Sequence, residues 1–420
     1  MDELKKTLTA WRGTALMLNI VLGAGLLTLP GLAERAAGGS ALLVWAACAL
    51  AAAPLLAVFA ILGRTFPSAG GLAAILGRAF GSFGYTAATL LFLGAVVFGL
   101  PAIALAGGYY AASMLGGPAH LYAALLLVSA VLANVISSEL AGRLNALIAS
   151  FLVIVLVLIA VIGLISVQPQ FSQTPMVTTP LPGIDILGLT FMMVFFAFTG
   201  WEVGANLSGE FKNPRRDFPI AMALSFVVAV ALYGALAIVA HYADLQGAYE
   251  APFSALFQQK FGAMGGMAVA AVSVLLIFAN LSAAVWAVSR MVYSAAQEGL
   301  LPGVLTTVHQ GTPYRAVLVT VSALLLVTLG AWFGWFRLDH LLALAGQNFL
   351  LLYAGAAAAL LRLSDRSAHR VLALVSLIMV AGLIIARGAE GMVYPGILIV
   401  TAFATSKLRG HSTARHFSEN

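Results

Sequence analysis

The chain has 420 residues, of which 62% are hydrophobic and only 9% are charged, and its formal net charge is +6. A typical soluble domain carries about 25% charged residues, so this chain has too little polar surface to cover a water-soluble core. The composition therefore predicts an integral membrane protein. The basic residues lie at the ends of apolar segments and do not gather on one soluble face, which argues against a nucleic-acid partner.

The sequence lacks the residue patterns of several kinds of chemistry. The single cysteine, Cys48, excludes an intramolecular disulfide, and the seven histidines show no metal-ligand spacing. Neither the His-Glu-x-x-His motif of metalloproteases nor the Gly-x-Ser-x-Gly motif of serine hydrolases occurs. We therefore expect no enzyme activity, no metal site and no cofactor. No cleavable signal peptide is evident, because the first apolar segment is long and ends in Leu-Pro-Gly.

Twelve apolar segments come near the roughly 20 residues that cross the hydrocarbon of a bilayer. Their approximate ranges are 11–36, 40–63, 83–115, 119–137, 142–166, 185–209, 218–241, 264–296, 315–334, 337–361, 369–387 and 391–407. The third and eighth are long enough to tilt strongly.

Lysine and arginine residues divide unevenly between the two sides of this arrangement. With the N-terminus inside, 17 of the 21 fall on the inner side, and only Arg35, Lys260, Arg337 and Arg387 fall on the outer side. Cytoplasmic loops carry such an excess of basic residues. The pattern therefore predicts both termini in the cytoplasm.

The first span contains an unusual stretch, Asn19–Pro30, in which Gly23 and Gly25 lie two residues apart. Two glycines lower helix propensity and allow a close approach to the backbone. An unwound turn would free N–H groups near Leu26 and carbonyls near Val21, and these could hold the carboxylate and the ammonium of a small zwitterion. The alternative is an unbroken helix whose small residues pack closely against a neighbour.

Two connections carry structure of their own. Residues 66–80 are interpreted as a turn followed by a short helix on the inner surface. Residues 168–185 form an outer connection that is rich in proline and threonine and has no lysine or arginine.

The sixth span repeats the pattern of the first, because Gly200 interrupts the aromatic run of Phe195–Gly204. Four complete crossings separate the two spans, so they cross the bilayer in opposite directions. Two interrupted helices in corresponding positions of antiparallel halves indicate an inverted-repeat transporter, with its binding site where the helices cross.

Glu202 is the one acidic residue placed well inside a span. An ionised, unpaired carboxylate at that depth costs on the order of 3 kcal/mol, so we expect it to be protonated or hydrogen-bonded. A protonation or gating site is one interpretation. A carboxyl that only caps exposed N–H groups where the second half-helix begins is the other.

Four ordered motifs resemble those of the amino acid–polyamine–organocation superfamily of permeases, over nearly the whole chain. They are Gly23-Ala24-Gly25, Pro67–Gly71 with Ala79-Phe80-Gly81, Gly200-Trp201-Glu202 with Glu210–Pro219, and Ser289–Ser294 with Glu298–Pro302. Phe98–Ala102 and Glu210–Pro219 are similar to the branch of bacterial exporters of methionine and branched-chain amino acids.

The resemblance implies an all-α integral membrane protein with twelve transmembrane helices in a five-plus-five inverted repeat, the leucine-transporter-like fold, with helices 1 and 6 discontinuous. Residues 1–166 would form the first repeat, 167–363 the second, and 364–420 helices 11 and 12 with a cytoplasmic tail. It also implies a multi-pass protein of the bacterial cytoplasmic membrane, and it leaves open a monomer or a homodimer.

By the same resemblance, the amides of Gly23, Ala24 and Gly25 would hold the substrate carboxylate. Carbonyls of Val21, Phe196 and Thr199 would take the ammonium, and Phe196 would act as an aromatic lid. The candidate substrate-binding set is Val21, Gly23, Ala24, Gly25, Phe196, Phe198, Thr199 and Gly200. Glu202 would serve coupling or gating.

The fifth span departs from some proton-coupled relatives, because it has Arg143 and Asn145 near its inner end but not the lysine that those relatives carry there. Gly99, Asn280 and Ser282 are candidates for an ion or side-chain pocket, and the last two could offer oxygens to sodium. We expect proton coupling rather than sodium coupling.

We expect a neutral, apolar amino acid as substrate, since no lysine or arginine is placed at the depth of the breaks and Glu202 is the only carboxylate there. An apolar pocket is predicted from Val97, Phe98, Leu100, Phe196, Phe198, Phe278 and Leu281. The sequence thus predicts a secondary transporter of methionine, leucine, isoleucine and valine that works by alternating access, as an exporter or with proton coupling. An exchanger, an importer of small neutral amino acids and a binding-only nutrient sensor remain as alternatives.

Overall fold

The protein is represented by a computed structural model that describes residues 8–66, 71–136, 138–172, 176, 181–205, 207–309 and 312–408. For residues 24, 134–136, 138–150, 152 and 205 only the backbone is described. Every regular element in these ranges is a helix, and the β contacts are two isolated bridges, Leu8 with Phe211 and His309 with Thr312.

The helices follow one another along the chain with short connections. They are α1 (Ala10–Val21), η1 (Ala24–Leu27), α2 (Leu29–Ala37), η2 (Gly38–Ser40), α3 (Ala41–Thr65), α4 (Gly71–Leu115), α5 (Ala119–Ile136), α6 (Ser138–Val167), η3 (Gln168–Ser172), α7 (Ile184–Phe195), η4 (Phe196–Phe198), α8 (Trp201–Ala205), η5 (Ser208–Glu210), α9 (Pro214–Tyr242), α10 (Pro252–Gln297), η6 (Gly303–Thr306), α11 (Tyr314–Trp332), α12 (Leu338–Leu363), α13 (Ser367–Arg387) and α14 (Ala389–Leu408).

All twelve predicted spans fall on these helices. The first span is divided over α1, η1 and α2, and the sixth is divided over α7, η4 and α8. Ten stretches of described helix are long and apolar enough to cross a membrane. The remaining two spans correspond to α1, which has 12 residues, and to α5, whose described apolar part is shorter.

The same kinked helix occurs once in each half of the chain. Gly81 divides α4 with φ 67° and ψ −154°, and Gly262 divides α10 with φ 73° and ψ −174°. Only glycine adopts such angles readily. Each glycine turns a short preceding helix, 71–80 or 252–261, away from the long span that follows it. Together with the two broken helices, this repetition gives the five-plus-five arrangement.

One detail differs from the sequence prediction, and another is described only in part. The helix at 252–261 was not predicted, because the apolar pattern of the eighth span begins only after Gly262. The predicted surface helix after the second span is present as 71–80, whereas the turn before it, 67–70, lies outside the described residues. The residue boundaries of the two repeats stay a prediction.

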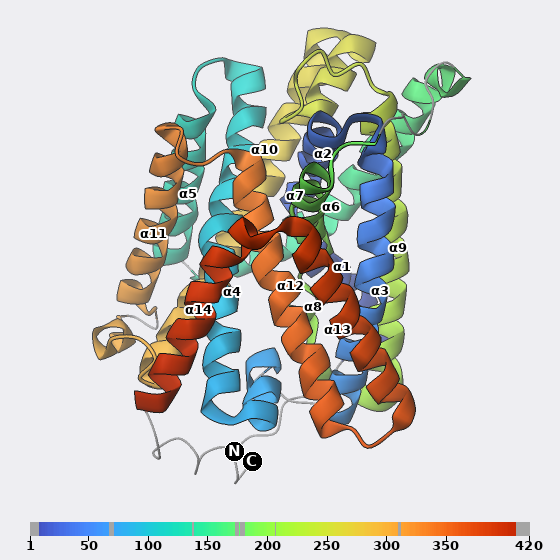
Figure 1. Ribbon diagram of the computed structural model, residues 1–420. Coiled ribbons are helices and arrows are strands. Elements are labelled where there is room, and N and C mark those ends of the chain that lie inside the picture. The colour runs from blue at the N-terminus through green and yellow to red at the C-terminus, as the bar shows by residue number, and fades with distance from the viewer. Residues whose placement is uncertain are drawn as a thin grey trace.

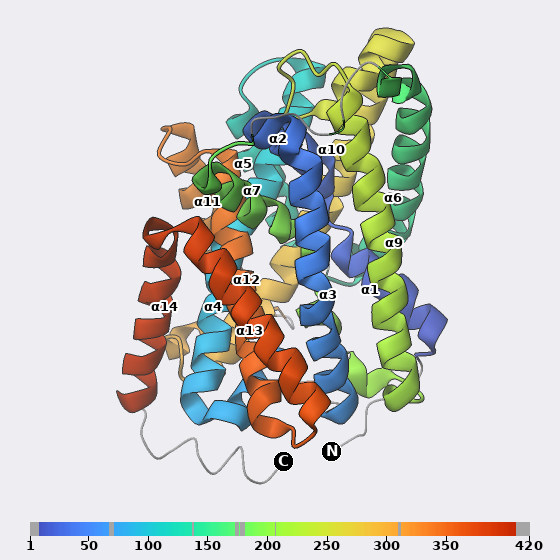
Figure 2. The same ribbon diagram turned by 45° about the vertical axis from the view of Figure 1, so that its right-hand side comes forward.

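The broken helices lie inside the bundle, and α13 and α14 form an inverted V at its edge (Figure 1). Helix α12 packs against α4 and α7, α10 packs against α4, and both α1 and α3 pack against α9. Helices α13 and α14 expose most of their apolar surface. Seen from a second direction, α3 and α9 run the length of the bundle side by side (Figure 2).

Three of the four basic residues predicted for the outer side lie at one end of the bundle. Arg35 lies in the last turn of α2, Arg337 precedes α12, and Lys260 lies in the helix before Gly262. Arg387, at the end of α13, lies deeper, beside Gly391 and Gln347 of α12. We call this end the α2 end, and the opposite end, where α1 begins and α14 finishes, the α1 end. The common location agrees with the twelve-span segmentation, and which end faces the cytoplasm stays a prediction.

Replacing Gly81 or Gly262 by alanine tests the two kinks. A Cβ at either position meets nothing within 4 Å, so the cost comes from the backbone angles alone. We expect each variant to lose about 1–3 kcal/mol of stability, seen as a lower melting temperature of the purified protein in detergent. Gly382→Ala in α13, which also has open space around it and an ordinary backbone, is the matched control. Equal melting temperatures for all three variants would contradict this account.

Candidate functional site: a cavity between two broken helices

The first break matches the predicted stretch. Helix α1 ends at Val21, Gly23 is extended with φ −73° and ψ 159°, and a single 3₁₀ turn leads into α2. Leu22 N still donates to Leu18 O at 2.8 Å, whereas Gly23 N turns back to Val21 O at 2.7 Å. The helix therefore ends before Gly23 and starts again beyond it, and the interpretation as one continuous, closely packed helix is wrong.

The second break lies where Gly200 was predicted to interrupt the sixth span. Thr199 is extended, with φ −107° and ψ 170°, and Gly200 has φ 111° before α8 begins at Trp201. That positive φ is open to glycine and strained for other residues. The glycine thus allows the sharp change of direction between η4 and α8.

The two breaks touch one another. A Cβ on Gly200 would lie 3.3 Å from Val21 Cα and 3.5 Å from Ile20 O. The Tyr233 hydroxyl of α9 lies 2.8 Å from Ala197 O and 3.3 Å from Val21 O, so one side chain bridges both breaks. Tyr110 of α4 donates to Leu27 O at 2.7 Å and fixes the far side of the first break.

A cavity of about 320 Å³ opens between the breaks, which is within the usual range for small-molecule sites. Nine predicted residues line it: Val21, Gly23, Gly25, Gly99, Phe196, Thr199, Gly200, Glu202 and Asn280. Along α10 the lining runs from Asn280 to Val288, about 12 Å at the rise of an α-helix. The cavity therefore extends from the breaks toward the α1 end.

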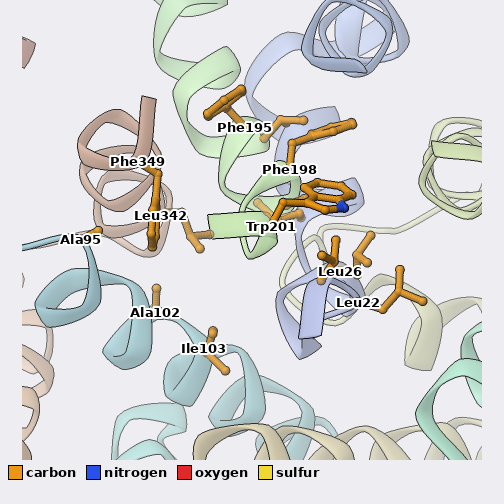
Figure 3. Packing of buried hydrophobic residues seen from close by; sticks show 14 of the residues in the cluster. Leu22, Leu26, Ala95, Ala102, Ile103, Phe195, Phe198, Trp201, Leu342 and Phe349 are labelled. Carbon is orange, nitrogen blue, oxygen red and sulfur yellow. The ribbon is translucent and has the colours of Figure 1, made fainter. Parts of the chain in front are cut away.

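The ring of Phe196 lies between two glycines at the centre of this cavity. Its Cε1 is 3.7 Å from the Cβ position of Gly25, and its Cε2 is 2.9 Å from that of Gly99. Phe349 of α12 packs against the same ring at a centroid distance of 6.2 Å. In Figure 3, Phe349 and Phe198 lie on opposite sides of the connection between α7 and α8.

Several predicted residues are not at the cavity. The ring of Phe198 packs against Trp45 and Tyr233, because the tight turn of η4 directs it away from Phe196. Ser282 is buried two residues after Asn280, on another side of α10, so the two do not face one space. The side chain of Ala24, and those of Arg143 and Asn145, lie outside the described residues.

The predicted apolar pocket is also changed. Leu100 and Phe196 line the cavity, whereas Val97, Phe98, Phe278 and Leu281 do not. Phe98, for example, packs against Phe336 and Tyr394. The apolar wall comes instead from residues that the sequence did not single out: Leu26, Leu29, Phe92, Val96, Ile103, Ala283, Ala284, Ala287, Val288 and Phe349.

The hydrogen bonds of the breaks distinguish the three carbonyls predicted for the ammonium. Val21 O accepts from Gly23 N and is within reach of Tyr233. Phe196 O accepts both from Thr199 N, at 3.3 Å, and from Thr199 Oγ1, at 2.8 Å. A carbonyl oxygen has two lone pairs, so Phe196 O has no acceptor capacity left. Val21 O shares the single hydroxyl proton of Tyr233 with Ala197 O, which lies closer, so it keeps part of its acceptor capacity. Thr199 O has no hydrogen-bond partner within the described residues.

Glu202 is buried and lies at the wall of the cavity. Its Oε2 accepts from Gly200 N at 2.8 Å and from the Tyr353 hydroxyl of α12. The first bond is the predicted cap on the exposed N–H groups at the start of α8. Glu202 also lines a second cavity of about 110 Å³, which reaches Leu72 and Ala73 in the helix at 71–80.

The functional residues missed by the sequence reasoning are mainly tyrosines. Tyr110, Tyr233 and Tyr353 are almost fully buried, and each hydroxyl bonds to a break or to Glu202. A tyrosine inside an apolar span is a usable signal, because its buried hydroxyl needs a partner. The signal does not identify that partner, which comes from a distant part of the chain.

At the α2 end, ion pairs close the bundle over the first break. Arg35 of α2 pairs with Glu250, in the connection before α10, and lies 3.6 Å from Asp339 of α12. Arg337 joins Asp339 at 3.1 Å. These bonds hold α2 against two other elements. The cavity itself extends from the breaks toward the α1 end.

Comparison with known proteins agrees with this geometry. The family model described as amino acid permease matches residues 8–409. The chain is 28% identical to an uncharacterized amino acid permease, YecA, of Bacillus subtilis, over 98% of this chain and 97% of that protein. It is 30% identical to the L-methionine/branched-chain amino acid exporter YjeH of Escherichia coli, over 84% of this chain and 85% of that protein.

A solved structure shares the fold. The manganese transporter of Eremococcus coleocola superposes with a TM-score of 0.62 over 99% of this chain and 98% of that chain, at 14% identity. A sequence identity of 14% supports a shared fold and nothing about a shared substrate. The match of the family model to nearly the whole sequence shows that this chain, a multi-pass membrane protein and not an enzyme, belongs to the amino acid permease family.

Proposed function

We propose that this permease is a secondary transporter that exports neutral, apolar amino acids across the bacterial cytoplasmic membrane by alternating access. The observation that carries the proposal is the cavity between the two breaks. Its wall is mostly apolar, it includes the single carboxylate of Glu202, and it contains no lysine, arginine or histidine among the described lining residues. A free amino acid with an uncharged side chain matches this wall.

The backbone of the breaks supplies the polar contacts for the two charged groups. The first N–H groups of a helix have no partner within that helix, and those of η1 follow directly after Gly23. These amides are proposed to hold the substrate carboxylate. The ammonium is proposed to bind at Thr199 O and at the carbonyl end of α1, where the helix dipole favours a cation.

The side chain of the substrate is proposed to lie against Phe196, between α4, α10 and α12. Leu100, Ile103 and Phe349 make this part of the wall apolar. Burial of an aliphatic side chain there is worth about 1.5–3 kcal/mol. A cationic side chain would find only the Glu202 carboxyl in the described wall, and its Oε2 already accepts two hydrogen bonds. An anionic side chain would find no lysine, arginine or histidine there.

The direction of transport and the coupling ion are further parts of the proposal. Similarity to a named exporter supports export. Glu202 supports coupling to protons, because its carboxyl lines both the central cavity and the smaller cavity that leads to the helix at 71–80. Both termini are proposed to lie in the cytoplasm, which makes the α1 end the inner side.

Substrate range can be measured with the purified protein in defined liposomes. Counterflow of [³H]leucine and [³H]methionine should exceed that of arginine and glutamate, because a charged side chain would be buried without a counter-charge at a cost of several kcal/mol. A preference for a charged amino acid would overturn the proposed substrate class. Saturable binding without movement of label would identify a sensor instead.

Coupling can be measured with imposed pH and sodium gradients. A proton gradient should stimulate transport by the parent protein, whereas Glu202→Gln should retain leucine binding and lose the stimulation, because the amide cannot take up or release the proton. Sodium should have little effect on either protein. Equal, gradient-independent transport by both would remove Glu202 from coupling and would indicate exchange or facilitated movement.

Gly99 sets the space available to Phe196, so its enlargement tests the side-chain pocket. A Cβ at Gly99 would lie 2.9 Å from the ring of Phe196 and 3.3 Å from Ala345 Cβ. We expect Gly99→Ala to move the ring into the cavity and to weaken leucine and methionine transport about tenfold, as overpacking costs about 1–3 kcal/mol, with a smaller effect on valine. Gly382→Ala is the control for expression and folding. An unchanged ratio of leucine to valine transport would contradict this placement.

A further inference from the structure

The central cavity offers few hydrogen-bond donors to a carboxylate. Among the described residues that line it, none is a lysine, an arginine or a histidine. The side-chain N–H donors in the wall are the carboxamides of Asn19 and Asn280 alone. An ionised carboxylate leaving water has about four lone-pair sites to satisfy, so donors beyond the backbone amides of one turn are needed.

Asn280 lies directly beside the first break. Its Nδ2 is 4.0 Å from the position that a Cβ on Gly23 would take. Gly23 is the residue before η1 and has no side chain to cap the N–H groups of that turn. The space between Asn280 and the backbone of the turn therefore stays open to a ligand oxygen.

The Asn280 carboxamide has no hydrogen-bond partner within the described residues, and it is only partly buried, at the surface of the cavity. The polar side chains of Thr199 and Glu202 in the same wall differ from it in this respect. Thr199 uses its hydroxyl on Phe196 O, and Glu202 accepts two bonds on Oε2. Asn280 thus has its full donor capacity available to a bound molecule.

Asn19 occupies the opposite side of the break. It lies in the last turn of α1, beside the carbonyl end of that helix, and its carboxamide is also without a partner in the described part of the chain. The dipole of α1 makes that end favourable for a cation rather than an anion. Asn19 and Asn280 are therefore chemically alike but placed at opposite ends of the break.

We infer that Asn280 is a substrate-binding residue that donates its amide N–H to the carboxylate of the amino acid and so determines the preference for a free carboxylate. The inference rests on the proposed function and assigns to one side chain of α10 a recognition step otherwise left to the backbone. A binding role and a purely structural role of Asn280 predict different results. If Asn280 binds the carboxylate, the effect of changing it depends on whether the ligand carries a carboxylate.

The test compares leucine with leucinamide, in which the carboxylate is replaced by a neutral amide. Binding is measured as ligand-dependent thermal stabilisation of the purified full-length protein, which also reports that each variant is folded. Asn280→Asp keeps the size of the side chain and introduces a negative charge. We expect it to weaken leucine binding at least about tenfold and leucinamide binding much less, because like charges repel at close range. Asn280→Ser should weaken leucine binding by a smaller factor.

Asn19→Asp is the matched control, since it places the same charge in the same cavity at the carbonyl end of the break. It should change the ratio of leucine to leucinamide affinity far less than Asn280→Asp does. An equal change in both variants would indicate a charge effect of the whole cavity and would overturn the assignment. An unchanged or tighter affinity of Asn280→Asp for leucine would also overturn it and would place the ammonium at Asn280.

Failure of the proposed function gives a different result. If the parent protein shows neither stabilisation by neutral amino acids nor counterflow of leucine, the substrate assignment fails and the role of Asn280 fails with it. If the parent protein binds and moves leucine while Asn280→Asp retains the parent ratio of affinities, only the role of Asn280 is refuted.

Discussion

The structure depends on one constraint, the cost of leaving backbone hydrogen-bonding groups without partners inside a membrane. Two helices nevertheless stop halfway, at Gly23 and at Gly200. The exposed groups are tolerated because the breaks lie against one another and share the hydroxyl of Tyr233. What is still unpaired faces a cavity, where a ligand or water can bind it. The broken helices and the binding cavity are therefore consequences of the same arrangement.

The hydrogen bonds of the described residues distinguish backbone carbonyls that look equivalent in the sequence. Of the three carbonyls expected to bind the ammonium, Phe196 O already accepts two hydrogen bonds and Val21 O accepts one from Gly23 N, whereas Thr199 O has no partner within the described residues. The hydrogen bonds of Glu202 also give this residue a structural role. Its carboxyl caps Gly200 and accepts from Tyr353, so α8 and α12 are joined through the one carboxylate in the wall of the cavity.

The two ends of the bundle are held together by different interactions. At the α2 end, Arg35 joins α2 to Glu250 and Asp339. At the α1 end, the cavity continues along α10, and Leu8 pairs with Phe211 to tie the start of α1 to the connection after α8. A transporter that works by alternating access exchanges which end is closed. Ion pairs hold α2 in place at one end here, and backbone pairing links the start of α1 to the segment after α8 at the other.

The sequence by itself determined the membrane class, the twelve spans, the two breaks and the family, because these depend on composition, period and glycine placement along the chain. It also identified Gly99, Asn280 and Glu202 before their surroundings were known. Only the tertiary structure decided that Phe198 and Ser282 face away from the cavity, and that Tyr233 and Phe349 belong to the site. The physical reason is that successive side chains point in different directions around a helix or a tight turn, so residues one or two positions apart face different sides. Their hydrogen-bond partners, in addition, come from spans that are distant in the sequence. Local patterns locate a break, whereas the packing of helices decides which atoms remain free within it.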